Sequence, residues 1–176
     1  SHQDPLTGLA NRRYLDEVLE IEWNRAMRHQ TPITIMMIDI DYFKLYNDSL
    51  GHLQGDQCLK RISILLSSIS SRSDDLAARY GGEEFLLLFA MTNQDQALIQ
   101  AQRLMELVRN IGIIHPRSNV SKHVTVSVGV ATTIPHLNDN LSEFIAQADR
   151  ALYIAKSNGR NQYHLTTTYH ETHEVM

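Results

Sequence analysis

The sequence predicts a single domain of α/β or α+β class, and two observations support this prediction. Of 176 residues, 43% are hydrophobic and 20% are charged, which suffices for one substantial core and excludes a wholly disordered chain. Helix-like and strand-like segments alternate along the chain without long linkers, low-complexity tracts or internal repeats. We therefore expect helices packed around a mostly buried sheet.

Hydrophobic periodicity assigns the individual elements. Apolar residues at three- and four-residue steps predict helices over about 9–28, 55–70 and 96–111, and a last helix from 141 that ends near Gly159. The run ITIMMIDI predicts a strand at 33–40 that is covered on both faces, and shorter runs predict strands over 76–80, 84–89 and 124–131. Gly81 and Gly82 predict a two-residue hairpin turn, because glycine readily adopts positive φ. Small residues alternate with valine in 124–131, which admits a closely packed helix.

The ends of the chain set the expected domain limits. We expect residues 1–165 to form the domain and 166–176 to form a mobile C-terminal tail, because the tail has almost no apolar content. Ser1 and His2 directly precede a turn-like segment, which suggests a domain taken from a longer protein with an upstream regulatory domain.

Charge and cysteine content narrow the functional class. Sixteen Lys and Arg against 20 Asp and Glu give a net charge of −4, too acidic for general nucleic-acid binding. Cys58 is the single cysteine and cannot form an internal disulfide, and no apolar run of about 18 residues appears. We expect a soluble, cytoplasmic domain that contacts neither nucleic acid nor membrane, whether or not the full-length protein is anchored in a membrane.

A carboxylate ends the most apolar strand of the chain. Asp39 lies in this strand and Asp41 follows two residues later. A buried carboxylate is costly unless it is neutralised, and Mg²⁺ held by a few protein oxygens and substrate phosphates would neutralise it. The alternative is that the aspartate caps the next helix.

Two further acids, Glu83 and Glu84, follow the paired glycines. Alone they would suit a solvated hairpin tip. If the two strands are neighbours in the sheet, however, these acids and Asp39 could meet and hold one or two metal ions.

Basic and polar residues offer groups for a nucleotide. Lys156 and Arg160 flank a helix end, where they either complement the helix dipole or clamp phosphate. In Phe43-Lys44-x-x-Asn47-Asp48 and Gly51-His52-x-x-Gly55-Asp56, side chains could bind a purine edge while backbone N–H groups hold phosphates.

These residues resemble the GGDEF domain of diguanylate cyclases, in the variant GGEEF at 81–85. The resemblance covers roughly residues 4–164. In the family's order the chain also contains DxLTGLxNRR from Asp4, DxDxFKxxNDxxGHxxGD from Asp39, Arg79-Tyr80, SxGVA from Ser127 and ADxALYxAKxxGRN from Ala148.

The resemblance implies a fold and a reaction. The fold is α+β and similar to the palm of nucleotidyl cyclases, with a central, mostly antiparallel five-stranded sheet surrounded by helices. The reaction condenses two GTP into cyclic di-GMP and two pyrophosphates, and each subunit of a homodimer presents one GTP. Two Mg²⁺ or Mn²⁺ ions per active site are implied as cofactors.

The resemblance also implies roles for individual residues. The metal ligands would be Asp39, the Ile40 carbonyl, Glu83 and Glu84. The catalytic residues would be Glu83, Glu84 and Lys44, with Glu83 as a candidate base. Phosphates would be held by Tyr42, Phe43, Lys44, Gly82, Lys156 and Arg160. Guanine would be bound by Asn47 and Asp56, and Asp56 favours GTP because its carboxylate can pair with guanine donors.

A second site is implied by Arg72-Ser-Asp-Asp75, which matches the RxxD product-inhibition motif of the family. Arg79 and Arg25 would assist it, so that cyclic di-GMP is both product and inhibitor. Considered alone, this segment would suit an exposed charged turn.

Other functions remain as alternatives. One is a catalytically silent domain that binds GTP or cyclic di-GMP for signalling, although such domains usually lack the acids present here. Another is a palm-type polymerase, which the net acidity and the missing basic, aromatic-lined groove disfavour.

Overall fold

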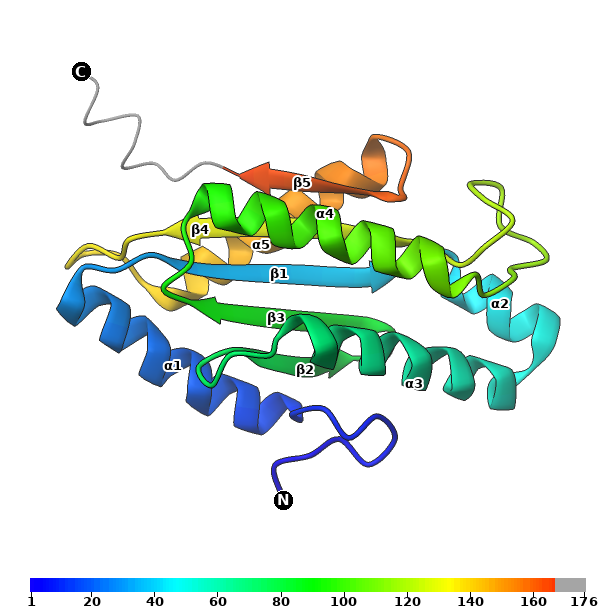
Figure 1. Ribbon diagram of the computed structural model, residues 1–176, viewed down its shortest axis with the longest axis horizontal. Coiled ribbons are helices and arrows are strands. Elements are labelled where there is room, and N and C mark those ends of the chain that lie inside the picture. Colours follow the sequence, from blue (N-terminus) through cyan, green and yellow to red (C-terminus); the bar gives the residue numbers. More distant parts are fainter. Residues whose placement is uncertain (167–176) are drawn as a thin grey trace.

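Five strands form one sheet in the order β2-β3-β1-β4-β5 (Figure 1). The computed structural model describes residues 1–166. The strands are β1 Ile33–Ile40, β2 Leu76–Gly81, β3 Glu84–Ala90, β4 Val126–Thr133 and β5 Gln162–Thr166. Strand β1 runs antiparallel to β3 and β4, and β2 runs antiparallel to β3, so that among these described strands the β4–β5 pairing is the one parallel pairing. The mostly antiparallel, α+β sheet predicted from the resemblance is confirmed.

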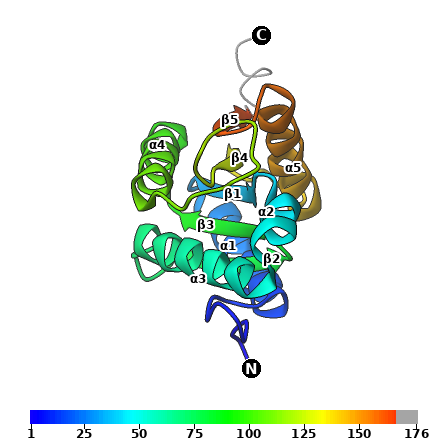
Figure 2. The ribbon, with the colours of Figure 1, turned by 90° about the vertical axis from the view of Figure 1, so that its right-hand side faces the viewer.

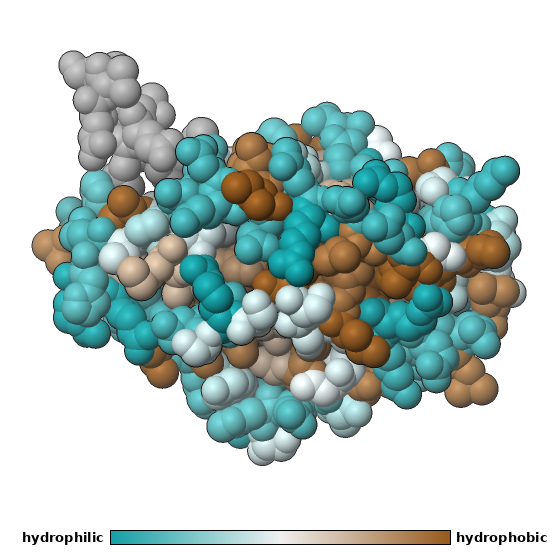
Figure 3. Space-filling model, viewed as in Figure 1, coloured by the Kyte–Doolittle hydropathy of each residue, from teal (hydrophilic) through white to brown (hydrophobic). Residues whose placement is uncertain are grey.

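Helices cover both faces of the sheet, so the domain has three layers (Figure 2). The helices are α1 Arg12–His29, α2 Phe43–Leu50, α3 His52–Ile69, α4 Gln94–Ile111 and α5 Leu141–Ser157. One core cluster joins the sheet to α3 and α4, and a second joins it to α1 and α5. The exterior over α3 and α4 is largely hydrophilic, with apolar side chains showing between the two helices (Figure 3).

Strand β1 is the centre of both clusters, and all eight of its residues are buried. Met36 and Ile38 belong to the cluster beneath α3 and α4, whereas Ile35 and Met37 belong to the cluster beneath α1 and α5. A strand covered on both faces needs apolar residues at successive positions, which explains the unbroken run in the sequence. Asp39 is therefore a carboxylate in the most enclosed strand.

Helix α5 approaches β4 at Gly129. A Cβ atom built on Gly129 would lie 2.2 Å from the carbonyl oxygen of Ala148 and 2.3 Å from the nitrogen of Leu152. The close helix predicted from the small residues of this strand is confirmed, because only glycine leaves room for the backbone of α5.

Local chemistry explains where the elements differ from the predictions. Helix α1 begins at Arg12 and not near residue 9, because the Asn11 side chain accepts a hydrogen bond from the Tyr14 N–H (2.9 Å) and caps the helix. Helix α2 and strand β5 have no counterpart in the periodicity, since both are short. The hairpin turn falls on Gly82 and Glu83 because the register shifts between Arg79 and Gly81, and Gly82 has φ +53°.

Two expectations concern the ends and the membrane. The predicted mobile tail lies outside the described residues, apart from Thr166, which ends β5. Within residues 1–166, none of the helices combines the length and the hydropathy needed to cross a bilayer.

Candidate active site

The predicted acids and cations meet at one end of the sheet, which faces the viewer in Figure 2. Asp39 near the end of β1 is directly opposite Glu84 in the β1–β3 register. The Ile40 N–H donates to the Glu83 carbonyl (3.3 Å), and the Lys156 ammonium near the end of α5 forms an ion pair with Asp39. The structure therefore brings β1, the β2–β3 hairpin and α5 together around one carboxylate.

Asp39 has one paired and one unpaired oxygen. Its Oδ2 accepts from Lys156, whereas its buried Oδ1 has no hydrogen-bond partner among the described residues. Burial raises the pKa of Asp39, Lys156 opposes that rise, and the nearby Glu83 and Asp41 carboxylates add to it. An unpartnered buried oxygen in negative surroundings is a fit for a divalent cation, which would supply the missing positive charge.

Glu84 shares this environment. Burial raises the pKa of Glu84, and the carboxylates of Asp39, Asp149 and Glu83 add to the rise while Lys156 opposes it. Within residues 1–166, no three His, Cys, Asp or Glu side chains are placed to hold a metal ion together. A metal here would use few side chains, the Ile40 carbonyl and substrate oxygens, which is the usual pattern for Mg²⁺.

Asp41 has a different task from Asp39. Its buried carboxylate accepts hydrogen bonds from the Thr125 hydroxyl (2.8 Å), the Ser127 hydroxyl (2.7 Å) and the Asn161 N–H (3.0 Å). With both oxygens occupied, Asp41 ties the end of β1 to β4 and to the start of β5. It is a structural anchor of the site.

The turn between β1 and α2 presents backbone N–H groups. Tyr42 precedes α2 in the left-handed conformation (φ 53°, ψ 38°), and no side chain caps this helix end. The first N–H groups of a helix are unsatisfied within the helix and attract anions. Lys44 is exposed on the first turn of α2, and the Arg160 guanidinium stacks on the Tyr42 ring at 4.6 Å. The surroundings suit phosphate.

Asn47 and Gly55 form a tight contact between α2 and α3. A Cβ atom on Gly55 would lie 1.8 Å from the Asn47 Oδ1, so only glycine accommodates this side chain. The Oδ1 atom is buried and has no partner in the described part of the chain. Asp56, the next residue of α3, is half-buried. The amide and the carboxylate are hydrogen-bonding groups suited to the edge of a base.

Comparison with known proteins decides the family. The family model for the diguanylate cyclase GGDEF domain matches residues 1–162. The chain belongs to the GGDEF-domain family. It is 39% identical over 163 residues to the probable diguanylate cyclase DgcT of Escherichia coli, covering 92% of this chain and 35% of that protein. Identity to the diguanylate cyclase DgcZ of the same organism is 38% over 164 residues, covering 92% and 52% of the two chains.

A solved GGDEF domain shows the same fold. The crystal structure of the GGDEF domain of DgcB from Caulobacter crescentus, in complex with c-di-GMP, superposes with a TM-score of 0.84 at 30% identity. The match covers 94% of this chain and 95% of that one. Against DgcT and DgcZ, by contrast, the chain spans only about a third to a half of the relative's length.

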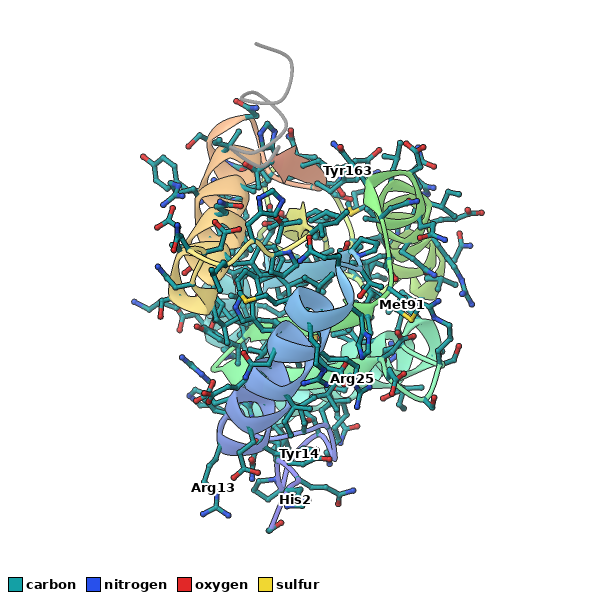
Figure 4. All side chains as sticks on the ribbon, turned by 90° about the vertical axis from the view of Figure 1, so that its left-hand side faces the viewer. His2, Arg13, Tyr14, Arg25, Met91 and Tyr163 are labelled. Atoms are coloured by element: carbon teal, nitrogen blue, oxygen red, sulfur yellow. The ribbon has the colours of Figure 1, made fainter. Side chains whose placement is uncertain are left out.

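The RxxD segment of this GGDEF domain lies in the α3–β2 connection. The Arg72 guanidinium donates to the Ala90 carbonyl (3.1 Å) and the Thr92 hydroxyl (2.7 Å), and it lies 3.6 Å from the buried Asp75 carboxylate. Arg25 of α1 lies 3.6 Å from Asp74. Arg25, Asp74 and Ala90 line a cavity of about 280 Å³, at the end of the molecule where Figure 4 labels Arg25 and Met91.

Arg79 is not brought to this segment. It lies at the opposite end of β2, where its guanidinium pairs with Asp4 (3.3 Å) and donates to the Gly82 carbonyl (3.0 Å). The family resemblance implied that Arg79 assists Arg72 at the product site. The extended strand between them separates them, so Arg79 supports the GGEEF hairpin instead.

Two contributors to the site were not predicted. Asp149 of α5 interacts electrostatically with Glu84, Lys156 and Arg12, and burial raises its pKa. Its position two helical turns before Lys156 could have placed it on the same face. His115, in the loop between α4 and β4, bonds the Tyr42 carbonyl. Nothing in the sequence pattern pointed to this residue.

Proposed function

We propose that this domain is a diguanylate cyclase, which condenses two GTP into cyclic di-GMP and two pyrophosphates across a two-fold homodimer. The observation that carries the proposal is the buried Asp39 Oδ1 beside Glu83 and Glu84, which has no hydrogen-bond partner in the described part of the chain. An acidic cluster next to free helix N–H groups and cations suits a nucleoside triphosphate with its counterion. GTP is a cytoplasmic substrate, and we assign the domain to that compartment.

In each half-reaction the 3′-oxygen of one GTP forms a bond to the α-phosphorus of the other. The bond from that phosphorus to the bridging oxygen breaks, pyrophosphate leaves with the electron pair, and the hydroxyl proton passes to a base. Glu83 at the hairpin tip is our candidate for that base. Bound at Asp39, the Ile40 carbonyl, Glu83 and Glu84, two Mg²⁺ or Mn²⁺ ions would neutralise triphosphate oxygens and charge developing at the α-phosphate.

The cations of the chain hold the phosphates in this scheme. Lys156 pairs with Asp39, and its ammonium would contact a phosphate oxygen of the bound substrate. Arg160, which stacks on the Tyr42 ring, and Lys44 on the first turn of α2 would hold phosphate oxygens together with the backbone N–H groups of Tyr42 and Phe43. Gly82 of the hairpin would be a further phosphate contact. These contacts orient the α-phosphorus for in-line attack.

Base selection rests on Asn47 and Asp56. The Asn47 Oδ1 has no hydrogen-bond partner among the residues that the structure describes, and it can accept from a guanine amino group. The Asp56 carboxylate accepts from guanine donors, whereas the adenine edge would leave it facing the N1 acceptor. We therefore propose GTP over ATP as substrate.

The Arg72–Asp75 segment is proposed as the product-inhibition site. Arg72 supplies a planar guanidinium for phosphate or a guanine edge, and the Asp75 Oδ1 has no hydrogen-bond partner within residues 1–166. Arg25 is close enough to assist through Asp74. Bound cyclic di-GMP would then hold the domain away from its catalytic partner.

The test is incubation of the protein with GTP and Mg²⁺ at concentrations that favour dimers, with nucleotides resolved by chromatography. We expect cyclic di-GMP from the wild type and none from Glu83→Ala or Glu84→Ala, with circular dichroism unchanged. Glu143→Ala is the matched control, because Glu143 is an exposed acid of α5 about 20 Å along the helix from Lys156. Tight GTP binding without turnover in a dimer would instead indicate a catalytically silent signalling domain.

A further inference from the structure

We propose that His115 is a positioning residue of this site. Through one hydrogen bond to the Tyr42 carbonyl it fixes the β1–α2 turn (residues 41–42), so that the Ile40 carbonyl and the α2 N–H groups face the substrate. The proposal rests on the proposed function for its catalytic consequence. The geometric part stands on the structure of the turn and the loop.

The β1–α2 turn needs an external restraint. Tyr42 adopts φ 53° and ψ 38°, a left-handed conformation that costs a residue with a side chain roughly 1–2 kcal/mol relative to the right-handed region. Strain of this kind persists only where surrounding contacts over-determine the backbone. Within residues 1–166, two groups reach the Tyr42 carbonyl: the Tyr46 N–H of the same helix (3.1 Å) and the His115 Nε2 (2.9 Å). His115 alone comes from a separate part of the chain.

The hydrogen bonds of His115 define which nitrogen carries the proton. Its Nδ1 accepts from the backbone N–H groups of Arg117 and Ser118, each at 3.1 Å. A nitrogen that accepts two such bonds carries no proton, so the neutral imidazole has its hydrogen on Nε2 and donates to the Tyr42 carbonyl. The ring is buried and meets the Tyr46 ring edge-on at 5.4 Å between centroids. Its orientation is fixed from three sides.

The loop that carries His115 is itself closed. The α4–β4 loop (residues 112–125) crosses the end of the sheet next to α2 (Figure 2). Backbone hydrogen bonds join His115 to Lys122 (2.9 Å) and Val124 to Ile113 (2.7 Å) across it. The same loop accepts the Asp41 N–H at the Thr125 carbonyl (2.9 Å). It therefore grips both residues of the β1–α2 turn, Asp41 through Thr125 and Tyr42 through His115.

Two variants distinguish the hydrogen bonds made by the two nitrogens of His115. An asparagine oxygen can replace Nδ1 but cannot reach Tyr42, so His115→Asn keeps the closure of the loop and loses the bond to the turn. A glutamine amide nitrogen can replace the Nε2–H, so His115→Gln keeps the bond to the turn. Side-chain size and burial change little between the two variants.

The experiment compares wild type, His115→Asn and His115→Gln by amide hydrogen exchange and by GTP turnover. We expect faster exchange at residues 43–46 in His115→Asn and a turnover loss on the order of tenfold to 100-fold, mainly in kcat. His115→Gln should restore slow exchange and most of the turnover. Nitrogen NMR of the wild-type imidazole should show the neutral form with its proton on Nε2.

Several results would overturn the proposal. These are a proton on Nδ1, unchanged exchange and turnover in His115→Asn, or equal losses in both variants. The NMR measurement on the wild type decides the case even if a variant fails to fold. If the wild type makes no cyclic di-GMP, the proposed function fails, whereas the exchange and NMR results still test the restraint on Tyr42.

Discussion

The contact of Asn47 with Gly55 allows a sharp test of the base-binding site through Gly55→Ala. The new Cβ atom would lie 1.8 Å from the Asn47 Oδ1, and ordinary contact begins at 3.4 Å, so the amide has to retreat by about 1.6 Å. Displacing a positioned group by about 1 Å can cost about 100-fold in rate. We therefore expect kcat/KM for GTP to fall by about 100-fold.

The same substitution should leave the fold nearly as stable. Alanine in a helix interior is about 1 kcal/mol more favourable than glycine, and overpacking of a core contact costs about 1–3 kcal/mol. The free energy of unfolding should therefore change by no more than about 2 kcal/mol. Loss of activity without loss of structure distinguishes a displaced binding group from a misfolded domain.

The assay measures turnover, affinity for a non-hydrolysable GTP analogue and urea denaturation. The control is the double variant Asn47→Ala/Gly55→Ala, in which the clash disappears. It should be about 1 kcal/mol more stable than Asn47→Ala and no less active than either single variant, because both remove the same group. Wild-type affinity and turnover in Gly55→Ala would refute the assignment of Asn47 to the guanine.

Three further predictions concern acids, product and thiol. Burial and Asp39 raise the pKa of Glu84, so the folded, metal-free protein binds protons more tightly than the unfolded chain and loses stability as pH rises through the range between the two pKa values. Glu84→Gln should therefore raise the melting temperature at pH 7 but not below about pH 4, and an equal effect at both would contradict this linkage. Arg72→Ala should weaken inhibition by cyclic di-GMP at least about tenfold, while the initial rate stays near wild type. The measurement is the initial rate at increasing concentrations of cyclic di-GMP. Unchanged inhibition would contradict the assignment of the product site to this segment. Burial raises the pKa of the Cys58 thiol to about 12, so iodoacetamide should label it slowly in the native protein and rapidly in urea, and fast native labelling would mean that α3 opens readily.

Long elements could be predicted from the sequence because their periodicity is strong. The buried run at 33–40 and the helical stripe of α5 follow from local pattern alone. Short elements could not: α2 has eight residues and β5 has five, too few for a periodic signal. Their existence depends on tertiary contacts, such as the pairing of β5 with β4.

The sequence predicts which residues form the site better than it predicts the contacts that they make. The meeting of Asp39 with Glu84 follows from antiparallel pairing, once β1 and β3 are neighbours. The sequence could not show that the Asp41 carboxylate would accept hydrogen bonds from Thr125 and Ser127, or that Arg79 would pair with Asp4. These outcomes depend on register and on contacts between distant segments, which single-sequence patterns do not contain.

The glycine at position 129 has a consequence beyond packing. The backbone of α5 lies against β4 there. Leu152, whose backbone nitrogen is at that contact, is one helical turn before Lys156. Any side chain at position 129 would displace α5 away from the sheet. The Lys156 ammonium would then move away from Asp39. The hydrogen atom that Gly129 carries in place of a side chain thus sets the distance of α5 from the sheet. Through that distance it also sets the ion pair between Lys156 and Asp39.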